Sequence, residues 1–288
     1  MSNSNRVLIP IDLTLGRGAL SPAVQQIVDT SEAEITLLHV VDSQSQLGHN
    51  GHTMRLMTEL ELFGNGQFRR ARISRRIEWG RPADCILSAI RVVRADVVLM
   101  SAGSAPLGGN ALSPVAAEVL AEAACPILLE WAVTAPVNQA RTHPVCCAIE
   151  FDRGEEAVMR EAAWAAARME APLKLICALV PGGANMALLW DSAGREREVA
   201  CVLSRMEGLR DRWAPGAEVH VGMGLPVSVF SRAIRSHRAG LLVTGSSHEA
   251  LLAAESECPV LYVPSARRMR AGRPDTARPA AYAVGGSA

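Results

Sequence analysis

The residues with the clearest capacity for chemistry form a stretch rich in glycine and serine after a short apolar run. Residues 100–104 read Met-Ser-Ala-Gly-Ser, two glycines follow at positions 108 and 109, and Ser113-Pro114-Val115 opens the next segment. Glycines let a backbone approach phosphate oxygens closely. A helix N-terminus adds unpaired N–H groups and the positive end of the helix dipole. Ser113 and Pro114 are equally typical of a plain helix start, with serine as the N-cap and proline at the first helical position. We favour the cap.

Other chemistry finds less support in the residues. Lys174 is the single lysine, and no glycine-rich run ends in a lysine as a Walker-type phosphate loop does. His49 and His52 have a spacing that could share a metal ion, but they stand in a glycine-rich stretch with no obvious third ligand, so we expect a solvated loop. The adjacent Cys146 and Cys147 sit in an apolar run and are interpreted as core residues. We find no catalytic constellation and expect no metal site and no enzyme.

The bulk composition narrows the function classes. The formal net charge is zero, which removes the general electrostatic argument for nucleic acid binding. No apolar run approaches the roughly 18 residues that a membrane span needs. The first five residues lack the charged and apolar regions of a signal peptide, and the seven cysteines include no CxxC pair. We therefore expect a cytoplasmic protein with free thiols and no membrane partner.

The strongest signal in the sequence is an internal repeat. Residues 7–12 and 145–150 share one pattern, an apolar run ending in an acid, at an offset of 138. The offset is 144 for the proline of Gly80-Arg81-Pro82 and its echo Gly224-Leu225-Pro226, and it is 133 for Cys125-Pro126 and Cys258-Pro259. An ordered series of matched blocks indicates a tandem duplication.

Each copy reads as short apolar strands that alternate with helical stretches. Strands that are apolar on both faces and alternate with helices predict a parallel sheet covered on both sides. We therefore expect two α/β domains, 1–134 and 135–265, followed by a disordered tail at 266–288 that is rich in Arg, Pro, Gly and Ala. The expected strands are near 6–12, 34–41, 71–78, 96–101 and 126–131, then 144–150, 172–180, 217–222, 240–245 and 259–263. The expected helices of the first copy are near 20–30, 53–63, 82–94 and 113–124.

These blocks resemble the universal stress protein family over essentially the whole ordered chain. The resemblance rests on Ile9-Pro10-Ile11-Asp12, on the second strand through Val40 and Asp42, on Gly80-Arg81-Pro82 and on Cys125-Pro126-Ile127-Leu128. It implies two tandem doubly wound five-stranded parallel-sheet domains, which are Rossmann-like and similar to the adenine-nucleotide α-hydrolase fold. It also implies that strands 126–131 and 259–263 pair across a pseudo-twofold axis. The fused pair would then form an intramolecular pseudo-dimer, and two chains could still associate as a homodimer.

Nucleotide-binding members of the family carry Gly-x2-Gly, a spacer of about nine residues and then Gly-Ser. In the first copy Ser101 and Ser104 replace the two glycines, and Ser113 and Pro114 replace Gly-Ser. The resemblance places a degenerate nucleotide pocket at the carboxyl ends of the strands, where Asp12 would hold a base or ribose or would simply fix the turn after the first strand. The candidate pocket residues are Pro10, Asp12, Val40, Met100, Ser101, Gly103, Ser104, Ser113 and Val115.

The second copy departs further from the nucleotide-binding pattern. The repeat offset falls from 144 at Gly245 to 133 at Cys258, so this copy is eleven residues short where the phosphate loop would lie. Glu150 also replaces the aspartate, with a side chain one methylene longer. We expect that the second copy has lost nucleotide binding.

The sequence thus predicts a cytoplasmic stress-response protein that acts without catalysis by binding partners, with no cofactor. Three alternatives stay open. They are a switch that binds ATP in the first copy, a weak ATPase or self-phosphorylating enzyme that depends on Asp12, and a module that senses another metabolite or an adjoining transporter. The sequence does not name the stress, the partner or the ligand.

Overall fold

The computed structural model describes residues 6–13, 20, 22–28, 33–42, 49–64, 68–103, 112–131, 143–151, 154–180, 192–245 and 258–264. The predicted domain boundary at 134/135 and the predicted disordered tail at 266–288 lie outside these ranges. So does the segment 246–257, which holds the predicted deletion of the second copy.

The first half of the chain alternates strands and helices throughout, as its sequence predicts. Proline occupies the first helical position of α3 and α4, where its missing N–H costs nothing because that donor has no intrahelical partner. The elements are β1 (Arg6–Pro10), α1 (Pro22–Val28), β2 (Glu34–Val41), α2 (His49–Gly64), β3 (Arg72–Trp79), α3 (Pro82–Val93), β4 (Val97–Gly103), α4 (Pro114–Glu122) and β5 (Ile127–Trp131).

The second half repeats this order over its described residues. Its elements are β6 (Val145–Ile149), α5 (Glu155–Arg168), β7 (Leu173–Leu179), α6 (Ser192–Trp213), β8 (Glu218–Met223), α7 (Pro226–His237), β9 (Leu241–Thr244) and β10 (Val260–Tyr262). Small local features repeat as well. Gly80 and Gly224 both adopt a positive φ, +148° and +131°, in the turn before a proline-started helix. A side chain would be strained there, which explains the Gly-x-Pro motif in both copies.

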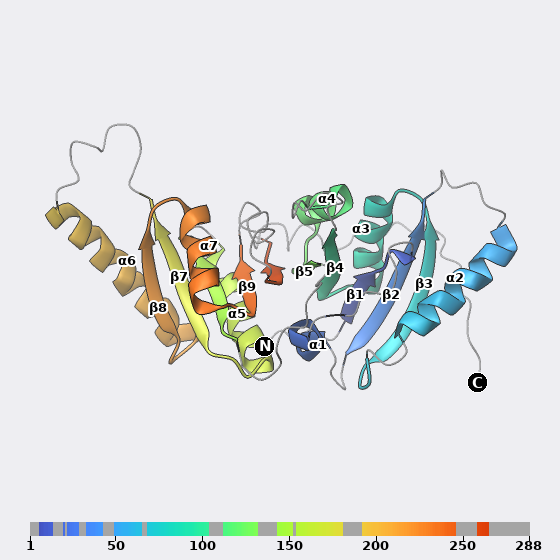
Figure 1. Cartoon of the computed structure of the whole chain (residues 1–288), viewed down its shortest axis with the longest axis horizontal. Helices are drawn as coiled ribbons and strands as arrows, with labels where there is room; N and C mark the ends of the chain where they lie inside the picture. Colours follow the sequence, from blue (N-terminus) through green and yellow to red (C-terminus); the bar gives the residue numbers. More distant parts are fainter. Residues whose placement is uncertain are drawn as a thin grey trace.

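The ten strands of the described residues form one sheet, in the order β3-β2-β1-β4-β5-β10-β9-β6-β7-β8. Within each half the strands are parallel, and the two halves join where β5 and β10 pair antiparallel. The expected pairing of the two last strands is therefore present, and it makes one continuous sheet from two five-stranded units (Figure 1). Each unit has the doubly wound order 3-2-1-4-5 in its own numbering.

The strand register repeats with the offsets read from the sequence. Val7 pairs with Ile35 and Val97, while Val145, 138 positions later, pairs with Leu173 and Leu241. The same agreement holds at the last strands. Val98 pairs with Ile127, and its counterpart Leu242 pairs with Val260, which carries the offset of 133. The duplication thus extends to individual backbone pairs.

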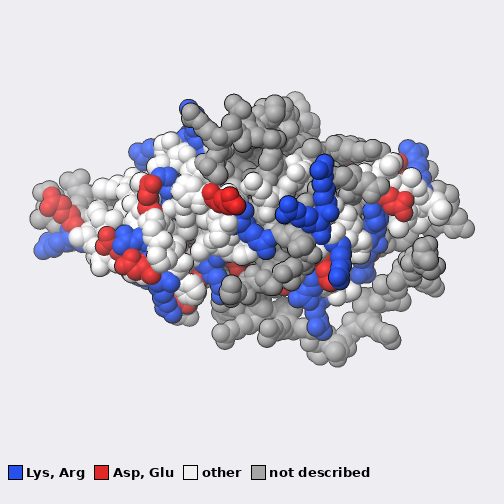
Figure 2. Space-filling model, turned by 90° about the horizontal axis from the view of Figure 1, so that it is seen from below, with Lys and Arg blue, Asp and Glu red and all other residues white. Residues whose placement is uncertain are grey.

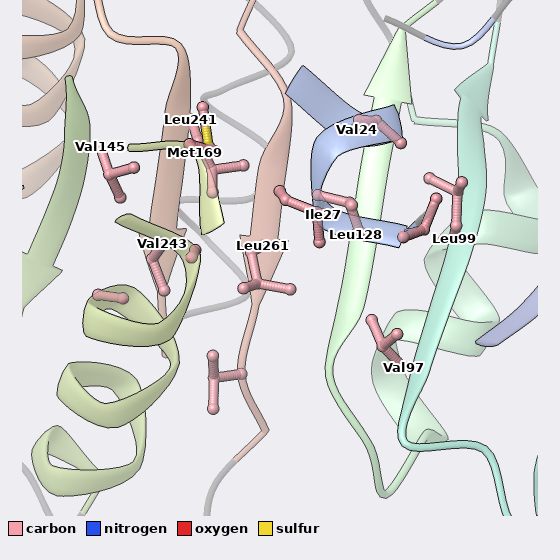
Figure 3. Packing of buried hydrophobic residues seen from close by; sticks show 14 of the residues in the cluster. Val24, Ile27, Val97, Leu99, Leu128, Val145, Met169, Leu241, Val243 and Leu261 are labelled. Atoms are coloured by element: carbon pink, nitrogen blue, oxygen red, sulfur yellow. The ribbon is translucent and has the colours of Figure 1, made fainter. Parts of the chain in front are cut away.

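Helices cover both faces of the sheet, and each face has its own layer of buried apolar side chains. One layer packs under α1, α2, α5 and α6, and the other under α3, α4 and α7. Both layers run through the junction of the two halves. Figure 3 shows Ile27, Leu128 and Leu261 packed together where the halves meet. The halves therefore share a core as well as a sheet.

Two boundary predictions were wrong. Helix α2 begins at His49, so His49 and His52 lie on a helix and not in a loop; the glycine between them, Gly51, did not prevent the helix from forming. Strand β4 continues past Ser101 to Gly103, because residues 98–103 pair with the whole of β5. No helix in the described part of the chain is long and apolar enough to cross a membrane.

Candidate functional site

The candidate pocket of the first half lies at the carboxyl ends of β1 and β4. These adjacent strands mark the point where the strand order reverses, which is where doubly wound sheets bind ligands. Pro10 ends β1, and the exposed Asp12 follows it. The Ile11 N–H donates to the Leu38 carbonyl at 2.7 Å, and Nδ1 of the buried His39 lies 2.9 Å from the Ile11 carbonyl. Strand β2 thus holds the backbone that presents Asp12.

The end of β4 is ordered by Ser101, one of the two serines that stand where the resemblance predicts glycines. The Ser101 hydroxyl accepts a hydrogen bond from the Gly103 N–H at 3.2 Å. The strand pairing shifts register between Ser101 and Gly103, and Gly103 has a φ of +125°, which a side chain would strain. The serine therefore stabilises a bulge at the strand end, and Ser101 and Gly103 belong to β4. Ser104 lies outside the described residues.

The start of α4 is the place where a phosphate would meet a helix N-terminus. Here the Ser113 N–H donates to the Ala102 carbonyl at 2.7 Å, and the Ser113 hydroxyl accepts from the Ala116 N–H at 3.1 Å. Pro114 has no N–H to offer. The prediction that Ser113 is an N-cap is confirmed. The Ser113 hydroxyl and the Ala116 N–H, which a phosphate would use, thus bind each other at the start of the helix.

The apolar candidates belong to the core layer under α3 and α4. Met100 is buried in that layer, and Val40 and Val115 pack against it while staying half-buried. Five of the nine candidates therefore lie at one end of the sheet, where they offer polar side chains or main-chain groups. They are Pro10, Asp12, Ser101, Gly103 and Ser113. The structure uses the three large apolar side chains as packing beneath them.

The equivalent place in the second half is a small hollow at the ends of β6 and β9. Its lining residues are Ala148, Glu150, Glu155, Val158 and Gly245, of which Ala148, Glu150 and Gly245 are the repeat counterparts of Pro10, Asp12 and Ser101. Its volume is about 10 Å³, the room of one water molecule. A Cβ placed on Gly245 would lie 2.9 Å from Cγ2 of Val158, so this valine occupies the space above the strand end.

The two α5 residues at this hollow, Glu155 and Val158, were not anticipated from the sequence. Glu155 stands in the first turn of α5 and forms an ion pair with Arg205 of α6 at 3.7 Å. Both residues lie in the first turn of the helix that follows the first strand of the second copy. That position is the signal that could have identified them. Side chains there point toward the strand ends of a doubly wound sheet.

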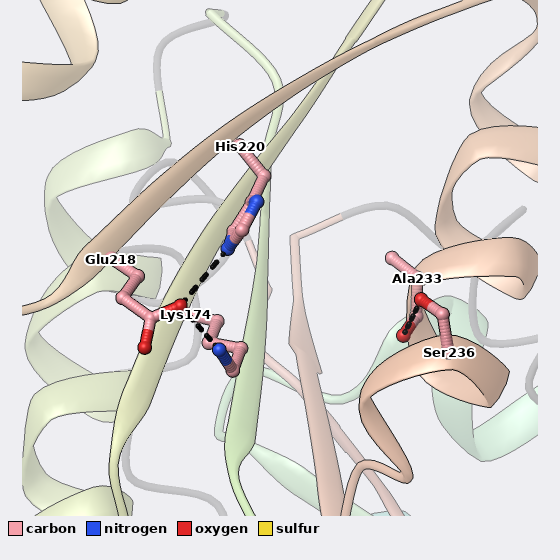
Figure 4. A network of polar contacts seen from close by, with 5 residues as sticks. All are labelled: Lys174, Glu218, His220, Ala233 and Ser236. Carbon is pink, nitrogen blue, oxygen red and sulfur yellow. Dashed lines mark hydrogen bonds and ion pairs between the residues drawn. The ribbon is translucent and has the colours of Figure 1, made fainter.

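A separate polar cluster lies on β7, β8 and α7 (Figure 4). Lys174 pairs with the Glu218 carboxylate, which also lies 3.3 Å from Nε2 of His220, and the rings of His220 and His237 are 4.8 Å apart. The Lys174 and His220 contacts lower the pKa of Glu218. Lys174 and Glu218 take the positions of Thr36 and Ser74, which hydrogen-bond to each other at 3.0 Å in the first half. The cluster thus holds an edge strand to its neighbour.

The adjacent cysteines of β6 lack the exposure that redox sensing needs. Cys146 and Cys147 are fully buried, as predicted, and burial raises the pKa of Cys146 to about 12. A thiol of that pKa is a poor nucleophile at neutral pH. Among the residues with described positions, no group of three or more histidines, cysteines and acids is arranged to hold a metal ion.

Comparison with known proteins connects the first half to a sequence family and the whole chain to a fold. Residues 3–129 match the model of the Universal stress protein family. A protein of unknown function from Pseudomonas aeruginosa PAO1 aligns over 94% of this chain and 96% of its own, with 17% identity and a TM-score of 0.63.

Two further structures align over nearly the full length. A putative universal stress protein from Pseudomonas aeruginosa UCBPP-PA14 has 17% identity, a TM-score of 0.62 and coverage of 94% of this chain and 97% of its own. A universal stress protein from Archaeoglobus fulgidus has 18% identity, a TM-score of 0.60 and coverage of 91% and 99%. These similarities show a shared fold over both halves. No curated protein matches the chain in sequence.

Proposed function

Because residues 3–129 match the model of the Universal stress protein family, we propose that the chain is a cytoplasmic stress-response protein that binds partners and catalyses no reaction. Nucleotide binding is degraded in the first half and lost in the second. The two halves act together as one pseudo-dimer, since they share a sheet and both core layers.

The observation that carries this proposal is the start of α4. A phosphate at a helix N-terminus needs free N–H groups, and a nearby hydroxyl adds to them. At this helix the Ser113 hydroxyl is bound by the Ala116 N–H, and Pro114 removes one donor. In the second half, Val158 packs over the strand end and leaves a hollow far smaller than a nucleotide. These observations support a protein that keeps the fold of a nucleotide site while its phosphate contacts are replaced.

An ATP-binding switch in the first half is the second candidate, and one observation favours it. Asp12 is exposed at the point where the strand order reverses, and hydrogen bonds between Ile11 and β2 hold the backbone next to it. A carboxylate held there could receive a ribose hydroxyl or a base N–H. The two candidates therefore differ in one measurable property, the affinity of the first half for ATP.

Calorimetric titration of ATP with Mg²⁺ into the purified full chain tests the proposal. We expect no binding heat and no rise in Tm. Binding tighter than about 100 μM, or about 5.5 kcal/mol, would contradict the proposal if Asp12→Ala abolished it. Asp42→Ala is the matched control, because Asp42 is likewise an exposed acid after a strand of the first half. Release of phosphate from ATP faster than in buffer would contradict the absence of catalysis.

A further inference from the structure

The first half carries a concentration of arginine at the edge of the sheet. Residues 69–79 include five arginines and one glutamate, although the whole chain is neutral. Strand β3 occupies most of this stretch and is the end strand of the sheet, where β2 is its one neighbour among the described strands. Figure 2 shows how the charged side chains are distributed on one face of the molecule. Blue side chains gather over the half that carries β1 to β5, while blue and red are mixed over the other half.

The second half shows that the fold does not need these arginines. Its edge strand β8 pairs with β7 in the register that β3 uses with β2, as Lys174 with Glu218 matches Thr36 with Ser74. Charged side chains commonly protect an exposed sheet edge from aggregation. Residues 213–223, which correspond to 69–79 at the other edge of the sheet, contain no arginine. Protection against aggregation therefore does not by itself explain the five arginines at the β3 edge. The counterparts of Arg69, Arg70, Arg72, Arg75 and Arg76 are Trp213, Ala214, Gly216, Val219 and His220.

The positive charge on β3 exceeds what the strand itself can neutralise. Glu78 pairs with Arg76 at 3.1 Å and is the one acid in the stretch. Arg72 is exposed, and the buried Nε of Arg75 has no hydrogen-bond partner in the described part of the chain. Guanidinium groups bind carboxylates through paired, charge-assisted hydrogen bonds. The edge is thus suited to additional carboxylates from outside the chain.

The backbone of β3 specifies the shape of the partner. The strand is eight residues long, and its outer side presents main-chain donors and acceptors that β2 does not use. Alternate residues face opposite sides, so Arg72 and Arg76 lie on the face of Ser74 and Arg75 lies on the other. An extended peptide that pairs with this edge would place its own side chains beside these arginines. A nucleic acid would use the charge but not the row of main-chain groups.

We propose that the β3 edge is a docking site for an extended acidic segment of a partner protein, which adds to the sheet as a further strand. The inference rests on the proposed partner-binding function and deepens it, because it names the surface and the chemistry of the partner. It is independent of the nucleotide measurement. The ATP titration can contradict the proposed function without affecting peptide binding, and the reverse also holds.

Fluorescence anisotropy with the full chain and a labelled ten-residue peptide of alternating Glu and Val tests the inference. The charge control is the same peptide with Lys in place of Glu. The backbone control carries N-methyl groups on alternate amides, which keep the charge and remove the donors that strand pairing needs. We expect the acidic peptide to bind, and both control peptides to bind at least about tenfold more weakly, since the Lys peptide loses the charge-assisted hydrogen bonds and the N-methylated peptide loses the main-chain hydrogen bonds.

Two triple variants locate the binding surface. Arg72→Ser with Arg75→Val and Arg76→Ser should weaken binding at least about tenfold, and Arg75→Val copies the second-half residue Val219. Arg197→Ser with Arg232→Ser and Arg235→Ser removes the same charge from exposed positions of α6 and α7 and should leave the affinity unchanged. Hydrogen exchange of the wild-type chain gives a measurement that needs no variant. Peptide should slow exchange at amides of residues 72–79.

Three results would overturn the inference. The first is no binding of the acidic peptide. The second is equal binding of the N-methylated peptide, which would show that charge alone attracts it. The third is tighter binding of a ten-residue oligouridylate that the β3 triple variant abolishes, which would assign the edge to single-stranded nucleic acid.

Discussion

Leu128 of β5 and Leu261 of β10 pair directly in the antiparallel contact between the two halves, and each is the repeat counterpart of the other. The flanking pairs are symmetric about them, since Ile127 pairs with Tyr262 and Leu129 with Val260. The pseudo-twofold axis therefore passes between Leu128 and Leu261. Both side chains are buried in the layer that α1 and α5 cover. The pseudo-twofold axis therefore passes through the place where the cores of the two halves meet.

Leu128→Ala should lower the free energy of unfolding by about 2–5 kcal/mol, because it removes a fully buried side chain and leaves a cavity at the junction. Leu261→Ala should lower the free energy of unfolding by a similar amount. Since the two leucines are in contact, the loss in the double variant should differ from the sum of the two single losses. Urea unfolding followed by circular dichroism measures all three. Leu62→Ala is the control, as Leu62 is 45% exposed and its truncation should change stability little.

Ser113→Ala should destabilise the protein by about 1 kcal/mol, because the Ala116 N–H loses its cap. Ser113→Asp keeps an acceptor at the N-cap and should retain most of the stability. Chemical denaturation compares the two variants with the wild type. Equal losses in both would show that Ser113 serves something other than the cap.

Glu161→Gln should stabilise the protein at neutral pH. The Glu161 side chain is nearly fully buried on α5, and burial raises its pKa although Arg160, with Nε 3.6 Å away, opposes the shift. A carboxyl whose pKa is raised in the folded state is penalised when ionised. The penalty is complete above the folded pKa and disappears as pH falls below the unfolded value of 4.5.

The stability difference between Glu161→Gln and wild type should therefore shrink steadily as the pH is lowered to 4 and below. Thermal unfolding across a pH series measures this difference. Glu196→Gln, at an exposed position of α6, is the control and should show no such trend. A difference that is constant with pH would mean that the substitution acts through packing and not through ionisation.

His237 should titrate below 6.5 in an NMR pH series. Burial lowers its pKa first, and the nearby positive charges of Lys174 and His220 lower it further, while Glu218 acts in the opposite direction. Lys174→Met should move the His237 pKa back up, and Glu218→Gln should move it further down. Because the folded chain binds this proton more weakly than the unfolded chain, His237 should reduce stability as pH falls through 6.5. An unchanged His237 pKa in both variants would contradict the electrostatic coupling of His237 to Lys174 and Glu218.

The repeat offsets made most of the fold predictable. A duplicated pattern of apolar runs determines which strands correspond, and equivalent strands then share register because the same faces must be buried. The pairing of Val145 with Leu173 and Leu241 follows from that of Val7 with Ile35 and Val97 in this way. Helix starts at Pro82, Pro114 and Pro226 were equally readable, since proline at the first helical position is a local signal.

The candidate site was only partly predictable. The family resemblance implied that Asp12, Ser101 and Ser113 lie at one end of the sheet, and local sequence pattern identified Ser113 as a cap. It did not place the end of β4, because the bond from Gly103 to Ser101 and the pairing with β5 are contacts that a propensity pattern does not encode. The net charge also did not predict the positive edge at β3, because a net charge of zero over the whole chain does not indicate where five arginines lie.

The sequence by itself determined the duplication, the order of strands and helices, and the shorter spacing between Gly245 and Cys258 in the second copy, because these depend on residue type and spacing along the chain. The tertiary structure decided which groups meet. It placed Val158 over Gly245 and left a hollow the size of one water. It also joined the ten described strands through Leu128 and Leu261, and it set the arginines of β3 on the end strand of the described sheet. Those outcomes depend on how side chains from distant segments fill the same space, which spacing along one chain does not specify.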